Sequence, residues 1–290
     1  MKHAYCIIAH HEPIILQKLI EAIDDRRNDI FVLIDKKANL PICNIKAYKS
    51  KLIYTPSIDV RWGDISQVKA ELMLFETATK YDVYQYYHLL SGVDLPIKSQ
   101  NYIHDFMDAN NGKEFVGYAQ NENNTYDLKR KTAYYYFLTK YYRSTSFYGT
   151  LCRYVCSLLL HLQQILGYNR NFGVELKKGA NWVSITHEFC IYLLSKRDYI
   201  LKTFKYTLAP DEMFVQTILW QSPFRINIYK FNNQFESCLR EIDWERGTPY
   251  TWGEQGEIDI QILKESEKLF ARKFSSLNMD FINKVRELSK

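Results

Sequence analysis

Residues 29–35 read Asp-Ile-Phe-Val-Leu-Ile-Asp, a run of five apolar side chains between two carboxylates. An apolar run this short, without alternation, indicates a strand in a sheet that is covered on both faces. Residues 5–9 form a similar run. Between the two runs, residues 13–26 predict a helix, because apolar side chains recur there at helical spacing after Pro13. This strand–helix–strand order predicts an α/β fold with a mainly parallel sheet.

The alternation of strands and helices continues along most of the chain. Further strands are predicted at residues 52–55, 86–90 and 182–185, and helices at residues 66–80, 187–201, 210–220, 258–269 and 279–288. The sequence contains no internal repeat and no segment with the composition of a linker. We therefore expect a single domain, interrupted near its middle by an insertion of different character.

The composition excludes several broad classes of protein. The chain has 290 residues, with 47% hydrophobic and 24% charged side chains, which argues against disorder and low complexity. No apolar run reaches the roughly 18 residues of a membrane-spanning helix, and the N-terminal run is too short for a signal peptide. The six cysteines lack the spacing of a zinc site, so we expect reduced thiols and a cytoplasmic protein.

The middle of the chain is basic and rich in tyrosine. Residues 126–153 carry six Lys or Arg against one acid, Asp127, and a leucine-rich stretch follows at 157–166. One interpretation of residues 143–166 is a buried amphipathic helix, and another is a helix at a membrane surface. A single-stranded nucleic-acid platform is a third, distant alternative. No nucleic-acid-binding motif supports it, so no nucleic-acid partner is expected.

Three short segments are candidates for a functional site. Asp35 follows a predicted parallel strand, at the sheet edge where nucleotides commonly bind, although it could simply begin a loop. Arg272 and Lys273 lie between apolar anchors that would fix their position, although an ordinary solvated basic pair is the simpler interpretation of these two residues alone. Residues 209–212, Ala-Pro-Asp-Glu, open a predicted helix, and capping of its positive end is the simplest interpretation of the two acids.

No common metal or phosphate motif is present. The sequence lacks HExxH, a Walker A loop and G-x-G-x-x-G. The residues His10-His11-Glu12 have no third potential ligand at a suggestive spacing, so we interpret them as contacts in a strand–helix loop. Asp-x-Asp is also absent, so any bound diphosphate would need cationic side chains to balance its charge.

Seven segments occur along the chain in the same order as in the core-2/I-branching β-1,6-N-acetylglucosaminyltransferases and peptide O-xylosyltransferases. The sequence resembles that family, and particularly its compact bacterial members. The resemblance covers nearly the whole chain and is weakest from residue 120 to 176. The most specific blocks are Ser-Gly-Val-Asp-Leu-Pro-Ile-Lys at 91–98 and Phe-Ala-Arg-Lys-Phe at 270–274. The others are Tyr-Cys-Ile-Ile-Ala-His at 5–10, Val-Leu-Ile-Asp-Lys-Lys at 32–37, Val-Arg-Trp-Gly at 60–63, Gly-Ala-Asn-Trp at 179–182 and Pro-Asp-Glu at 210–212.

The resemblance implies a GT-A-type glycosyltransferase fold, with a mainly parallel central sheet flanked by helices. It divides the chain into a nucleotide-sugar-binding half (1–118), a helical insertion (119–178) and a catalytic and acceptor-binding half (179–290). It also implies an inverting enzyme that needs no metal or other cofactor, in agreement with the missing Asp-x-Asp. The donor would be a UDP-sugar, most simply UDP-GlcNAc, with UDP-xylose or another UDP-sugar as the alternative.

The acceptor implied is a glycan or a lipid-linked saccharide, as in the synthesis of bacterial surface polysaccharide. Such an enzyme would lie in the cytoplasm, with possible peripheral contact at the inner face of the cytoplasmic membrane. The oligomeric state is left open.

The resemblance also assigns roles to individual residues. Glu212 matches the catalytic base, and Arg272 and Lys273 match the pair that binds the donor diphosphate. The remaining positions are nucleotide contacts at Ile8, His10 and Asp35, donor-sugar contacts at Trp62 and Asp94, and acceptor contacts at Asn181, Trp182, Trp244 and Arg246.

Three features depart from the family pattern. Asn181 stands where some relatives carry an acid. Trp244 and Arg246 stand where the animal branching enzymes carry two aromatic residues, so the acceptor is left open. An additional upstream arginine of those animal enzymes has no clear counterpart, and the adjacent Arg272 and Lys273 would replace it.

Overall fold

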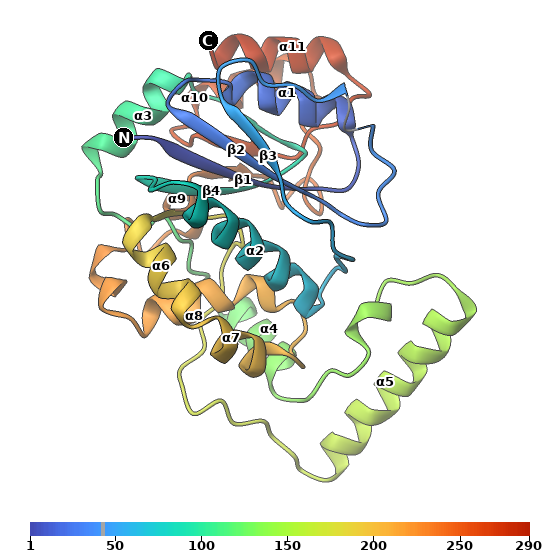
Figure 1. Ribbon diagram of the computed structural model, residues 1–290. Helices are drawn as coiled ribbons and strands as arrows, with labels where there is room; N and C mark the ends of the chain where they lie inside the picture. Colours follow the sequence, from blue (N-terminus) through green and yellow to red (C-terminus); the bar gives the residue numbers. More distant parts are fainter. Residues whose placement is uncertain (42–43) are drawn as a thin grey trace.

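The computed structural model describes residues 1–41 and 44–290, and it contains a central five-stranded sheet (Figure 1). The strand order is β3-β2-β1-β4-β6. Strands β1, β2, β3 and β4 run parallel to one another, whereas β6 pairs antiparallel with β4. The strands are β1 (His3–Ala9), β2 (Asn28–Ile34), β3 (Lys51–Tyr54), β4 (Tyr86–Ser91) and β6 (Ser184–Thr186).

Helices cover both faces of this sheet, as the unbroken apolar run in β2 requires, and every residue of β2 is buried. One hydrophobic core joins the sheet to α1 (Pro13–Ile23), α3 (Gln100–Ala109), α10 (Glu257–Glu265) and α11 (Met279–Leu288). A second core joins the other face to α2 (Ile65–Tyr81), α6 (His187–Ser195), α7 (Arg197–Phe204) and α8 (Phe214–Trp220). The predicted α/β class with a mainly parallel sheet is confirmed, and the arrangement is consistent with a GT-A-like fold.

A smaller sheet brings distant segments of the chain together. Its order is β5 (Asp94–Pro96), β8 (Phe270–Arg272) and β7 (Arg240–Ile242), and the short helix α9 (Gln234–Cys238) precedes β7. Strands β5 and β8 pair antiparallel, with Asp94 opposite Arg272. The two most specific sequence blocks are therefore neighbours in space.

Several predicted boundaries were wrong, and each error has a local cause. The predicted helix 210–220 is a 3₁₀ turn, η3 (Pro210–Glu212), followed by α8, because Met213 leaves helical geometry at φ −135°. The helix predicted at 187–201 divides at Lys196 into α6 and α7. The helix predicted at 258–269 ends at Glu265, and the strand predicted from Trp182 begins at Ser184.

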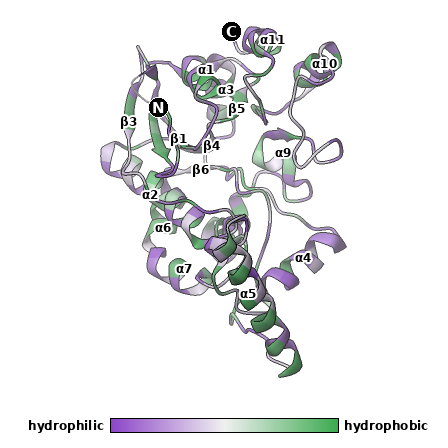
Figure 2. Ribbon diagram, turned by 90° about the vertical axis from the view of Figure 1, so that its right-hand side faces the viewer, coloured by the Kyte–Doolittle hydropathy of each residue, from purple (hydrophilic) through white to green (hydrophobic). Residues whose placement is uncertain are grey.

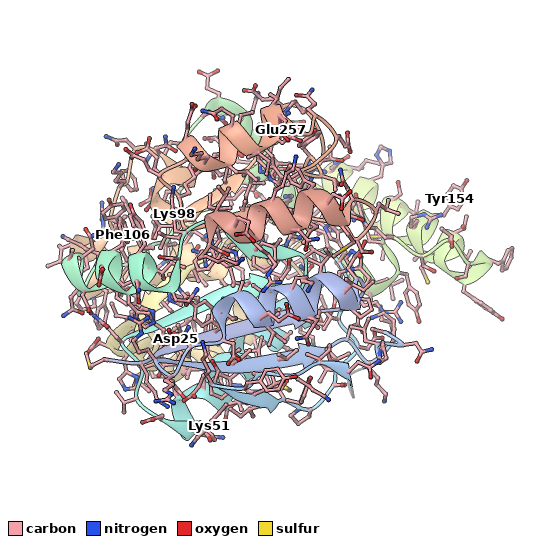
Figure 3. The ribbon with its side chains drawn as sticks, turned by 90° about the horizontal axis from the view of Figure 1, so that it is seen from above. Asp25, Lys51, Lys98, Phe106, Tyr154 and Glu257 are labelled. Atoms are coloured by element: carbon pink, nitrogen blue, oxygen red, sulfur yellow. The ribbon has the colours of Figure 1, made fainter. Side chains whose placement is uncertain are left out.

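The insertion contains α4 (Glu122–Thr132), the 3₁₀ turn η2 (Thr139–Tyr141) and α5 (Phe147–Ile165). Helix α5 projects from the body of the molecule (Figures 1 and 2), and Figure 3 labels Tyr154 on this projection. A further 3₁₀ turn, η4 (Pro223–Asn227), follows α8. Within the described ranges, no helix is long and apolar enough to cross a membrane. The cysteines there are free thiols, and Cys43 lies outside the described residues.

Candidate active site

The carboxylate of Glu212 is held at one oxygen by two lysines. Its Oε2 accepts a hydrogen bond from Lys131 Nζ at 2.8 Å, and Lys178 Nζ lies 3.5 Å from the same atom. The backbone is fixed as well, because the Gly179 N–H donates to the Glu212 carbonyl at 2.9 Å. Both lysine contacts use Oε2, and no ion pair or hydrogen bond from the described residues reaches Oε1.

The two lysines are themselves tied to Asp127 on α4. Asp127 Oδ2 lies 2.8 Å from Lys131 Nζ and 2.6 Å from Lys178 Nζ. Burial alone would lower the pKa of Lys131, but the charges of Glu212 and Asp127 raise it above its ordinary value. Sequence analysis did not assign these residues to the site. The signal it contained was Asp127, the one acid in a basic stretch.

Asp211, the residue before Glu212, and Glu71 are two buried carboxyl groups that interact with each other. Asp211 Oδ2 accepts hydrogen bonds from Gln67 at 2.9 Å and from Asn181 at 3.4 Å. Burial and the adjacent Glu212 raise the pKa of Asp211 to about 7. Burial, followed by the charge of Asp211, raises the pKa of Glu71 well above its ordinary value. One oxygen on each of these two carboxyls is buried and has no hydrogen-bond partner among the described residues.

Asn181 and Trp182 link this carboxyl cluster to the basic pair. The Asn181 side chain donates a hydrogen bond to Asp211. The guanidinium of Arg272 lies 4.4 Å from the centre of the ring of the next residue, Trp182. Arg272 Nη1 also lies 2.8 Å from Oδ1 of buried Asp94. Asp94 in turn accepts from the backbone N–H of Ser91 at 2.8 Å. Arg272 is therefore oriented from two sides.

Lys273 is differently placed. Its backbone is fixed, since the Trp252 N–H donates to its carbonyl at 2.9 Å and the Trp252 indole donates to the Arg272 carbonyl at 2.9 Å. Its ammonium, however, has no ion pair or hydrogen bond within residues 1–41 and 44–290. A fixed backbone with a free cation suits a group that binds an anion.

The predicted nucleotide contacts gather at the ends of β1 and β2. Asp35 is buried, its N–H donates to the Ala9 carbonyl at 2.9 Å, and its carboxylate binds Lys37 Nζ at 2.8 Å. Ile8 is half-buried in β1 opposite Leu33. Partial burial and the neighbouring His11 lower the pKa of His10, while the charges of Asp35 and Arg272 also act on it. His10 therefore lies close enough to both Asp35 and Arg272 for their charges to affect its pKa.

Trp62 lies at the edge of the same site. The carbonyl of the next residue, Gly63, accepts from the Ala209 N–H at 2.9 Å, which joins this loop to the turn carrying Glu212. The Trp62 side chain is 41% exposed, and Arg143 Cζ lies 3.6 Å from its ring centre. A cation therefore covers the indole ring.

Two predicted acceptor contacts are not joined to this network. Trp244 is 54% exposed on the loop after β7. Arg246 is paired with Asp243 at 2.5 Å and with Asp259 at 2.8 Å, and its guanidinium lies 4.0 Å from the Tyr250 ring centre. These contacts fix the loop, and the two carboxylates balance the charge of Arg246.

No group of three or more His, Cys, Asp or Glu side chains that could hold a metal ion occurs in the described part of the chain.

Comparison with known proteins decides the family. The model of the family described as "Branch: Core-2/I-Branching enzyme" matches residues 3–266. The chain belongs to the core-2/I-branching enzyme family. Arg272 and Lys273 lie just beyond the matched range, so their place in the site rests on the pairing of β8 with β5.

Two curated relatives of this family member share the name xylosyltransferase. Xylosyltransferase 2 of Mus musculus is 20% identical over 94% of the chain and 32% of its own length. Xylosyltransferase oxt of Drosophila pseudoobscura pseudoobscura is 25% identical over 74% of the chain and 24% of its own length. The chain thus spans about a third or less of the length of these relatives.

Proposed function

We propose that this core-2/I-branching family member is an inverting glycosyltransferase that moves a sugar from a UDP-sugar to a glycan hydroxyl. The observation that carries the proposal is the chain of contacts between Glu212 and Arg272. It runs through Asp211, Asn181 and Trp182, and it joins one carboxylate to a cationic pair across two halves of the chain. Transfer from a nucleotide diphosphate requires both a base and an electrostatic partner for the leaving group.

In this mechanism, Glu212 Oε1 accepts the proton of the acceptor hydroxyl. The oxygen of that hydroxyl attacks the anomeric carbon from the face opposite the diphosphate, so one C–O bond forms as the other breaks and the configuration inverts. The two lysines on Oε2 hold the carboxylate in one orientation.

The UDP that departs gains negative charge on its outer phosphate as the bond breaks. Arg272 and Lys273 are proposed to stabilise that charge, the first oriented by Asp94 and Trp182 and the second free to move onto a phosphate oxygen. These cations would act without a metal ion. Asp35, His10 and Ile8, at the edge of the parallel sheet, are proposed to contact the nucleoside.

The identity of the donor sugar has two candidates within this proposal. UDP-GlcNAc is the first, and UDP-xylose gains weight because the relatives described above are named xylosyltransferases. Trp62 and Asp94 are the proposed donor-sugar contacts. A panel of UDP-sugars in a hydrolysis assay, with thermal-shift measurements alongside, distinguishes them. The donor is the sugar nucleotide that is hydrolysed fastest and protects the fold most.

The central test compares Glu212→Gln with the wild-type chain in UDP-sugar hydrolysis, with Glu245→Gln, at an exposed glutamate, as the matched control. We expect Glu212→Gln to lose at least a hundredfold in rate while UDP still binds, since general-base catalysis contributes about 10²–10⁴-fold. Glu245→Gln should leave the rate unchanged. Full activity of the Glu212→Gln variant contradicts the assigned base. Loss of activity in EDTA, restored by manganese, contradicts the metal-free scheme.

A further inference from the structure

Helix α5 presents an unpartnered apolar face to solvent. The six side chains of this outer face recur at intervals of three or four residues, and each is at least 44% exposed. They are Phe147, Leu151, Tyr154, Leu158, Leu162 and Ile165. In Figure 2 the projecting helix is coloured largely as hydrophobic, and Figure 3 places Tyr154 well outside the body of the protein. An apolar stripe of this length on a projecting helix indicates an interaction surface.

The opposite side of α5 attaches the helix to the rest of the insertion. Gln163 accepts from the Tyr135 N–H at 2.8 Å and donates to the Tyr135 carbonyl at 3.1 Å. Cys156, on the same side as Gln163, is buried. The helix is therefore held by its inner side, and this attachment turns the outer face away from the protein.

The charge around the outer face identifies the kind of partner. Residues 128–174 contain seven Lys or Arg and no Asp or Glu. Five of these cations have no carboxylate partner in the described part of the chain, and the exposed Lys140, Arg143 and Arg153 are among them. A second copy of this face would bring like charges together. An anionic lipid surface would satisfy both the apolar stripe and the cations.

We propose that the outer face of α5 docks this protein on an anionic membrane surface. The docked segment is joined to the active site, because Thr139 donates to Asp64 at 2.6 Å and Arg143 covers the Trp62 ring. Docking therefore sets the orientation of the donor-sugar side of the site relative to the bilayer. The proposal concerns binding and does not depend on the proposed transferase activity.

The test is co-sedimentation of the full chain with vesicles of phosphatidylcholine alone and with 30% phosphatidylglycerol. We expect the partition coefficient to rise about 25-fold with the anionic lipid, since Lys140 and Arg153 each contribute roughly fivefold and Arg143 is held on the Trp62 ring. High salt should reverse most of the gain. The double variant Leu158→Glu/Leu162→Glu should lose binding to both vesicle types. The matched control is Leu277→Glu, at an exposed leucine outside the insertion, and should bind as wild type.

Two further measurements keep the proposal open to refutation if the double variant fails to fold. Lys140→Gln/Arg153→Gln retains the apolar stripe and should lose about 25-fold in partitioning to anionic vesicles. In the wild-type chain, vesicles should slow amide exchange over residues 147–165. The proposal is overturned if the wild type does not bind anionic vesicles, if the charge variant binds equally well, or if sedimentation velocity shows that the outer face is covered by a second copy. UDP binding, measured in parallel, reports on the transferase site separately.

Discussion

The guanidinium of Arg272 lies 4.4 Å from the centre of the Trp182 indole ring. This contact joins β8, near the C-terminal end of the chain, to the loop that also carries Asn181. Within residues 1–41 and 44–290, Asp94 is the one carboxylate paired with this guanidinium, and the indole orients it from a second side. In the proposed function, the indole would therefore contribute to diphosphate binding through Arg272, without touching the anion.

Replacing Trp182 tests that contribution. We expect Trp182→Leu to lower UDP affinity and kcat/KM about 3- to 30-fold, because a cation–π contact contributes about 0.5–2 kcal/mol. Trp182→Phe keeps an aromatic face and should retain most of both quantities. Isothermal titration with UDP and initial-rate kinetics provide the measurements. Equal losses in the Leu and Phe variants would contradict the cation–π interpretation and indicate a role in packing.

The Lys131–Glu212 contact predicts an effect on kcat. Lys131→Met removes the donor that lies 2.8 Å from Glu212 Oε2, so the carboxylate loses one of the two lysine contacts that orient it. We expect kcat to fall about tenfold or more while UDP affinity stays unchanged, because a hydrogen bond to a charged group contributes about 1.5–3 kcal/mol. Lys129→Met, on the exposed side of the same helix, is the control and should leave kcat in place. An unchanged kcat in Lys131→Met argues against the positioning of Glu212 by this lysine.

The buried Glu71–Asp211 pair should destabilise the fold as pH rises. Their pKa values are raised in the folded protein, to about 7 for Asp211, so the folded state holds protons that the unfolded chain loses near pH 4. Stability is then lost as pH rises from 4 through 7. Glu71→Gln should unfold at higher denaturant concentration than wild type at pH 8, by about 1 kcal/mol or more, and should match it near pH 4. A gain that is the same at both pH values would contradict this linkage.

Three buried histidines predict instability in acid. His3, His88 and His104 form a contiguous group, and burial lowers the pKa of each, to about 4 for His104. Between pH 6.5 and 4 the unfolded chain binds protons that folded His104 does not, so its contribution to stability falls as pH decreases. His104→Gln should reduce the pH dependence of unfolding over that range by up to about 1.4 kcal/mol per pH unit. Denaturant titrations of the wild type and the variant at pH 7, 6 and 5 measure this pH dependence of the free energy of unfolding.

Gly179 is required by a close approach of two backbone segments. A Cβ at this position would lie 1.8 Å from the Gly117 carbonyl oxygen, and the Gly179 N–H holds the Glu212 carbonyl. Gly179→Ala should therefore cost about 1–3 kcal/mol of stability and displace Glu212, with a larger loss of kcat than of UDP affinity. Gly173→Ala has open space around it and meets only the strain of a positive φ. Gly173→Ala should leave the reaction rate unchanged. Urea unfolding measures the stability of the two variants, and initial-rate kinetics measures their activity.

The sequence predicted well those features that depend on neighbouring residues. The apolar run at 29–35 and the helix at Met279–Leu288 were found because burial and helical spacing are local patterns. Lys131 was not assigned to the site, because its contact with Glu212 spans 81 residues and depends on how the insertion folds back. The break at Met213 was also missed, since the tertiary setting of η3 overrides the helical spacing of the residues after Pro210. The ion pair between Arg246 and Asp259 in α10 was not predicted either, because it depends on how the loop after β7 packs against that helix, and the acceptor role of Arg246 stays a prediction.

The small sheet has a consequence for synthesis of the chain. Its middle strand, β8, pairs with β5 from the first hundred residues and with β7, and it carries Arg272. The residues before 260 already contain the parallel sheet, Asp35 and Glu212, but neither Arg272 nor Lys273. In the proposed function, the two cations that bind the diphosphate therefore become available only when the ribosome has released β8, after the parallel sheet and the proposed base have been synthesised.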